Sequence, residues 1–194
     1  PVQTPTLRPG ARDPVEILSA ASNAVGHDVS SPEVRDQLLQ YAHGLYTQGP
    51  PQADAAAKGT DKLHPTLLPL LHTLHKLHPD HLPILLLLSC AYYAANNYAG
   101  SLWYNNQILR IDPNYVESMS NIGTTLRALG RYQEAESWWW RAVRLRPGYW
   151  DAYENLLGVM CSANPPSEAA NGSGANDAAK EQPPSQPRFK EALE

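Results

Sequence analysis

Residues 121–147 read NIGTTLRALGRYQEAESWWWRAVRLRP, and this segment ends on a proline that recurs along the chain. Pro79, Pro113 and Pro147 follow one another at a constant interval of 34 residues. Small and aromatic residues recur at the same interval. A constant interval of this length is typical of repeat proteins, in which one small structural unit is copied and stacked.

The interval equals the length of a tetratricopeptide (TPR) repeat, which is a pair of antiparallel helices. Gly123 and Ala135 stand where two helices cross closely, since a larger side chain would force them apart. Gly130 ends the first helix with a residue that tolerates positive φ, and Pro147 follows the second helix, which it could not continue. We therefore expect an all-α fold of TPR helix-turn-helix repeats, stacked into a right-handed superhelix with a concave groove that holds other proteins.

The repeat frame divides the chain into an N-terminal tail and four units. The tail, 1–31, is expected to contain a short helix that begins at a capping box around Asp13 and ends near Val25. The units are expected at 32–81, 82–115, 116–149 and 150–194. Helices are expected near 32–47, 62–77, 82–95, 98–110, 116–129, 132–145 and 150–161.

Two insertions interrupt this frame. The first unit is degenerate, and extra residues at about 49–61 widen its turn. A low-complexity insert at about 162–187 interrupts the last unit, and its composition predicts an irregular surface loop. RFKEALE, at 188–194, then resembles the start of the missing second helix.

Composition excludes some classes of function. The net charge of −4 is mild and the basic residues are scattered, so the sequence does not predict a nucleic-acid-binding protein. The apolar run Leu82–Leu88 is far too short to span a bilayer. Cys90 and Cys161 lie far apart in the repeat frame and are expected to be free thiols in a reducing compartment. The chain begins without Met and ends within an expected helix, so we expect it to be a piece of a longer protein.

Histidines are concentrated in one segment, and they suggest a metal-binding helix as one alternative. These residues are His64, His72, His75, His78 and His81. Leu67, Leu71 and Leu74 occupy the buried positions of the same helix, so we expect the histidines to point outward. Too few other ligands converge on them for a metal site to be favoured.

Three consecutive tryptophans, Trp138–Trp140, allow two interpretations. In the repeat frame Trp139 takes the buried aromatic position of a second helix, and Trp138 and Trp140 would wedge against neighbouring units. Clustered aromatics also anchor protein interfaces, so a binding surface is the alternative. The structural interpretation is favoured because second helices mainly form the convex side and the interior of a repeat stack.

Asn121 and Asn155 both stand at the sixth position of their units, on first helices whose exposed face lines the groove. A carboxamide has two donors and two acceptors, so it can pair with the backbone of an extended peptide. An equally good explanation is that asparagine serves packing and solvation at this position. The residues expected to line the peptide-binding groove are Asn121, Asn155, Glu117, Ser120, Thr124, Arg127, Asp151 and Glu154. No catalytic constellation or phosphate-binding loop is present in the sequence.

Several longer motifs carry a more specific resemblance. They are LLLLS at Leu85–Ser89, SNIG at Ser120–Gly123, GRYQEA at 130–135, AVRLRP at Ala142–Pro147 and DAYENL at Asp151–Leu156. With these motifs, roughly residues 32–161 resemble the N-terminal TPR array of protein O-GlcNAc transferases. The LLLLS helix is atypical of TPR units in general, and the two insertions resemble the filamentous-fungal branch of that family.

The resemblance implies a parent enzyme that transfers N-acetylglucosamine from UDP-GlcNAc to Ser and Thr of cytoplasmic and nuclear proteins. Its catalytic domain would lie C-terminal to the TPR array, so this segment is expected to hold no catalytic residue and no cofactor. The family's groove carries an asparagine ladder that grips the substrate backbone, and Asn121 and Asn155 match ladder positions. Leu87 and Gln40 occupy that position in the earlier units, so the ladder would begin at Asn121.

The main rival is a non-enzymatic TPR scaffold or adaptor. A version that clamps a C-terminal carboxylate with Lys or Arg is disfavoured, because Glu117 would repel that carboxylate. A scaffold with another partner stays open. On either hypothesis the expected partners are proteins held in the groove.

Overall fold

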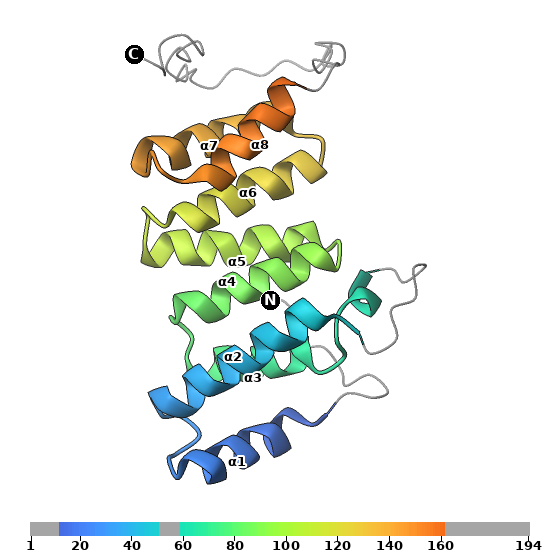
Figure 1. Ribbon diagram of the computed structural model, residues 1–194, viewed down its shortest axis with the longest axis vertical. Coiled ribbons are helices and arrows are strands. Elements are labelled where there is room, and N and C mark those ends of the chain that lie inside the picture. The colour runs from blue at the N-terminus through green and yellow to red at the C-terminus, as the bar shows by residue number, and fades with distance from the viewer. Residues whose placement is uncertain (1–11, 51–58, 162–194) are drawn as a thin grey trace, which may run out of the picture.

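The computed structural model of the 194-residue chain describes residues 12–50 and 59–161 (Figure 1). Within these ranges the chain forms eight α-helices and a short 3₁₀ helix, and it contains no strand. The α-helices are α1 (Pro14–Val25), α2 (Pro32–Gln48), α3 (Leu67–Leu77), α4 (Leu82–Ala94), α5 (Tyr98–Ile111), α6 (Val116–Ala128), α7 (Tyr132–Leu145) and α8 (Trp150–Met160). The expected all-α fold is therefore confirmed.

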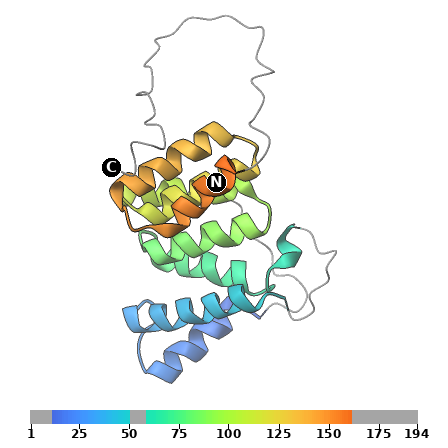
Figure 2. The same cartoon turned by 45° about the horizontal axis from the view of Figure 1, so that its top comes forward.

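The helices stack in chain order along the long axis, from α1 at one end to α8 at the other (Figure 1; Figure 2). Helices α4 and α5 pack as one pair and α6 and α7 as the next, and α5 and α7 each contact the first helix of the following unit. First helices also contact one another, α4 with α6 and α6 with α8, whereas α5 and α7 are not in contact within the described chain. The stack is therefore shorter along its first helices, which places α4, α6 and α8 on the concave side of a TPR superhelix.

Local sequence signals mark several helix ends. Ser31 Oγ accepts a hydrogen bond of 3.4 Å from the Val34 N–H at the start of α2, and Pro32 occupies the first helical position. Gly130, with φ of 77°, follows α6 in the left-handed conformation expected of it. Except for α3, every helix expected from the repeat frame begins and ends within one residue of its predicted bounds.

Helix α3 is shorter than predicted. Instead of one helix from residue 62, Gly59–Lys62 forms a separate 3₁₀ helix and α3 begins at Leu67. Pro65 explains the break, because a proline disfavours helical backbone at the residue before it. The short helix expected to end near Val25 is α1, and it packs against α2 and α3 with Leu18 in the core.

Several expectations fall outside the described residues. These are the first part of the tail (1–11), most of the insertion near 49–61, the insert at 162–187 and the second helix at 188–194. Among the helices of the described ranges, none has the length and apolar character that crossing a membrane requires.

Trp139 anchors the pair formed by α6 and α7. Its side chain is fully buried, as predicted, and its indole Nε1 donates a hydrogen bond of 3.1 Å to the Ser120 carbonyl. A Cβ atom at Gly123 would lie 2.5 Å from that nitrogen, so only glycine fits where the ring crosses α6. The helix crossing therefore requires a small residue at position 123 because the Trp139 indole packs directly on it.

His72 differs from its prediction. It is buried rather than outward-facing, with Nε2 2.9 Å from the Tyr92 hydroxyl and its ring against Tyr104. Helix α3 lies between α2 and α4, which cover it on two sides. The face of α3 that carries His72 is therefore not exposed to solvent, contrary to the prediction. Burial lowers the pKa of His72 to about 4, with smaller contributions from His75 and Lys76. No group of three metal-ligand side chains is found in the part of the chain that the structure describes.

Truncating Trp139 should destabilise the stack. The change Trp139→Ala removes a fully buried ring and its hydrogen bond, so we expect the free energy of unfolding to fall by about 3–5 kcal/mol. Thermal or denaturant unfolding measures this loss. Trp150, which is 72% exposed, is the control, and Trp150→Ala should change stability by less than about 0.5 kcal/mol. Equal melting of Trp139→Ala and the parent would contradict the packing described.

Two glycine-to-alanine changes should have opposite signs. At Gly123 the new methyl would meet the Trp139 ring, so we expect a loss of about 1–3 kcal/mol from overpacking. At Gly44, within α2, no atom lies within 4 Å of the added Cβ, so Ala should stabilise the helix by about 0.5–1 kcal/mol. Urea unfolding of the two variants measures both changes in the free energy of unfolding. An unchanged free energy for Gly123→Ala would mean that α6 and α7 can move apart at little cost.

Stability should fall as the pH falls through the titration of His72. Its pKa is 6.5 when unfolded and about 4 when folded, so between these values the unfolded chain binds more protons and acid favours unfolding. The loss between pH 6.5 and pH 4 should reach at most about 3 kcal/mol. The variant His72→Gln should show a flatter dependence in melts across this window. The exposed His43→Gln is the control and should keep the parent's slope.

Candidate functional site

The uncovered side of α6 carries a single stripe of polar residues. Helix α6 contacts α4, α5, α7 and α8, and most of its residues are buried. Glu117, Asn121, Thr124 and Arg127 stay partly exposed, at spacings of four, three and three residues, which place them on one helical face. Because α6 lies on the inside of the curve, this stripe faces the concave side, and it contains four of the predicted groove residues.

Among the described residues, the Asn121 side chain has only one weak hydrogen-bond partner. Its Nδ2 donates to Cys90 Sγ on α4 at 3.7 Å, and a thiol is a weak acceptor. Burial raises the pKa of the Cys90 thiol, so the acceptor is uncharged at neutral pH. A peptide carbonyl would be a stronger acceptor than the thiol, so the amide of Asn121 has little to lose by exchanging partners.

Glu117 is not an isolated negative charge. Arg146, the residue that follows α7, holds its carboxylate at 2.6 Å and stacks over Tyr149 at 5.5 Å from the ring centroid. Burial and the nearby Asp151 and Glu117 raise the pKa of Tyr149 to about 12, so this tyrosine stays protonated. Since the positive charge of Arg146 neutralises Glu117, Glu117 would repel a bound carboxylate less than the sequence alone suggested.

Ser120 does not face the groove, which corrects the prediction. It is only 3% exposed, and its carbonyl accepts hydrogen bonds from Trp139 Nε1 and from Thr124 Oγ1. Its side chain lies against the hydroxyl of Tyr149, the residue before α8, so Ser120 is covered and is not open to the groove. Arg127 covers the Trp139 ring from outside, with its guanidinium 5.7 Å from the ring centroid.

On α8 the predicted residues are accessible. Asp151 and Glu154 are exposed, and Asn155 is partly exposed. Asn155 Nδ2 donates to the Asp151 carbonyl of its own helix at 2.8 Å, which leaves its amide oxygen and its second N–H for a ligand. Helix α8 is the last described helix, and the second helix expected for its own unit lies outside the described residues. Residues of α8 can therefore be exposed without facing the groove, so exposure identifies groove residues less clearly here than on α6.

Three concave-side residues were missed. Cys90 and Tyr93 of α4 hold the positions that Thr124 and Arg127 hold one repeat later, so the same 34-residue frame would have located them. Tyr46 is on α2, which contacts α4. Burial raises the pKa of Tyr46, with smaller contributions from Cys90 and Tyr93. All three are partly exposed and extend the Asn121 surface along the stack, with a thiol and two aromatic rings.

Comparison with known proteins agrees with this architecture. Residues 116–146, which contain all of α6 and α7, match the tetratricopeptide repeat family. The first TPR domain of human RPAP3 superposes with a TM-score of 0.55 at 17% identity, covering 67% of this chain and 92% of that one. The Sgt2 TPR domain from Aspergillus fumigatus gives 0.53 at 16% identity, covering 78% and 93%. The fold is therefore that of a TPR repeat domain, a class whose members bind other proteins.

Two curated proteins are similar at the level of sequence. Anaphase-promoting complex subunit 7 of Homo sapiens, and equally that of Mus musculus, is 30% identical over 80 residues. The match covers 41% of this chain and 14% of each relative, so the chain spans about a seventh of the length of the curated proteins it matches.

Proposed function

We propose that this chain is the N-terminal TPR segment of a protein O-GlcNAc transferase-like enzyme, where it recognises protein substrates or adaptors. The observation that carries the binding role is the concave stripe of α6, with the Asn121 carboxamide held only by a weak thiol acceptor. The transferase assignment is supported by the motifs that resemble that family in α4, α6, α7 and α8. On this proposal the longer protein acts in the cytoplasm and nucleus with UDP-GlcNAc as donor, and its catalytic residues lie outside this segment.

The proposed mode of binding uses the asparagines to read backbone. An extended peptide along the concave side would accept a hydrogen bond from the Asn121 Nδ2 and donate one to its amide oxygen. Asn155 stands one 34-residue repeat further and would repeat the contact. Such contacts are independent of the peptide's side chains, which suits an enzyme with many protein substrates.

A non-enzymatic scaffold is the second candidate. The similarity to a subunit of the anaphase-promoting complex supports it, because that relative is named as part of an assembly rather than as an enzyme. Because Arg146 neutralises Glu117, a scaffold whose groove binds a C-terminal carboxylate also becomes compatible with the structure. Incubating the full-length protein with UDP-GlcNAc and an acceptor protein separates the two candidates, since only the first predicts sugar transfer.

Removing both ladder asparagines should weaken modification of protein substrates. In the full-length protein, Asn121→Ala with Asn155→Ala deletes two contacts per residue, each contributing a net of about 0.5–1.5 kcal/mol. We expect kcat/KM to fall by at least about tenfold for a protein substrate, and to stay unchanged for a short peptide that reaches only the catalytic domain. Steady-state rates on both substrates provide the measurement.

The matched control is Asn114→Ala, at an exposed asparagine in the loop between α5 and α6. It should leave both rates as in the parent. Equal loss on the two substrates, or loss on neither, would mean that Asn121 and Asn155 are structural.

A further inference from the structure

A pocket lies on the convex side of the stack, where α5 and α7 are not in contact. It is open to solvent and has a volume of about 560 Å³. Its principal walls are Trp103, Gln107 and Arg110 of α5, Pro113 of the following loop, and Trp138 and Arg141 of α7. No Asp or Glu is among the described residues that line it. Helices α5 and α7, which are the second helices of their units and were expected to be mainly structural, therefore form a pocket on the convex side.

Two indole rings flank this pocket. Trp103 is 41% exposed and packs edge-to-face against Tyr104, with ring centroids 4.7 Å apart. Because Tyr104 is buried in the core, this contact holds Trp103 in place. Trp138 is partly exposed on α7. Exposed but rigid tryptophans contribute large contact areas at low entropic cost, and they are enriched where proteins bind one another.

Two arginines supply the charge. The Arg141 guanidinium lies 5.4 Å from the centroid of the Trp138 ring, and its Nη2 donates to the Pro113 carbonyl at 3.3 Å. These contacts fix its direction and leave most of its five N–H donors open. Arg110 is exposed, and no hydrogen-bond or ion-pair partner is found for it among the residues that the structure describes.

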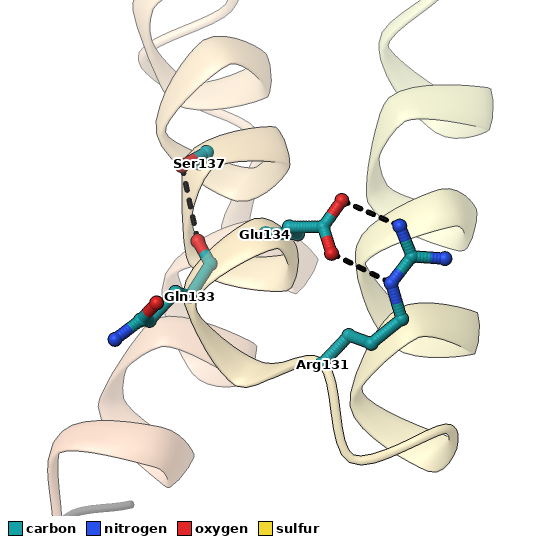
Figure 3. Close-up of polar contacts among 4 residues, drawn as sticks. All are labelled: Arg131, Gln133, Glu134 and Ser137. Carbon is teal, nitrogen blue, oxygen red and sulfur yellow. Dashed lines mark hydrogen bonds and ion pairs between the residues drawn. The ribbon is translucent and has the colours of Figure 1, made fainter. Parts of the chain in front are cut away.

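Two other exposed arginines of the described chain are held by carboxylates. Arg131 Nε and Nη2 each donate to a carboxylate oxygen of Glu134 at 2.6 Å (Figure 3). Arg146 holds Glu117 in the same way at 2.6 Å. Arg127 and Arg144 form no ion pair among the described residues, but neither lines the pocket. The pocket brings Arg110 and Arg141 together with no Asp or Glu in its lining, so it is a site of uncompensated positive charge in a chain whose net charge is −4.

We propose that this convex pocket binds an acidic linear segment of a partner protein. An apolar side chain of that segment would lie between Trp103 and Trp138, and adjacent carboxylates would pair with Arg110 and Arg141. A single-stranded nucleic acid could also stack on indoles, but it carries one phosphate per nucleotide and the chain is acidic overall with few free cations here. The contacts around the pocket thus favour an acidic peptide, and its binding would be independent of Asn121 and Asn155.

The indole N–H signals of the protein provide a direct test. The ¹⁵N-labelled 194-residue chain is titrated with short synthetic peptides that combine Asp or Glu with Phe or Leu. The signals of Trp103 and Trp138 should shift, while those of buried Trp139 and of Trp150, which does not line the pocket, should stay in place. Peptides with Lys in place of the acidic residues, and a short oligouridine, should shift none of them.

Variants test the assignment of the charges. Arg110→Glu changes an exposed side chain and should weaken peptide binding by at least about tenfold, with an unchanged melting temperature. Lys76→Glu, an equal change of charge on exposed α3 surface outside the pocket, should leave the affinity as in the parent. The proposal is overturned if acidic peptides shift neither indole, if basic peptides bind equally, if oligouridine binds more tightly, or if Arg110→Glu binds as well as the parent.

Discussion

Trp139 lies across Gly123, and the missing side chain there lets α7 approach α6 closely enough for the indole Nε1 to reach the Ser120 carbonyl. A TPR helix pair is too small to bury its apolar face alone, so it depends on such close crossings and on stacking against the next pair. Within the described chain α6 contacts helices on both sides of it along the stack, and α8 packs on α7. The position of every later helix therefore depends on this crossing.

The same crossing determines how the two surfaces of the stack are presented. With one flank of α6 held against Trp139, Ser120 is turned inward and the neighbouring Asn121 is left at the concave side. On the opposite side, the curvature that brings α4, α6 and α8 together separates α5 from α7, and the pocket between Trp103 and Trp138 is the result. A polar concave side and an aromatic, basic convex pocket are thus two consequences of one packing geometry.

Most of the helices could be predicted from the repeat frame, because the 34-residue interval repeats both the apolar positions and the residues that end helices. The buried Trp139 and the small Gly123 followed from that frame as well. The frame failed for α3, where the repeat is degenerate. There the apolar pattern alone suggested that the histidines point outward, but a second layer of helices covers His72 and pairs it with Tyr92.

The sequence by itself determined the all-α class, the helix ends outside α3 and the residues of α6 that share one face, since these depend on spacing along a single helix. Only the tertiary structure decided that Ser120 is interior, that Glu117 is balanced by Arg146, and that an unpaired arginine lies beside two indoles. The physical reason is that each of these features joins side chains from different helices. Contacts of that kind depend on the distance and angle between helices, which the periodicity of one helix does not specify.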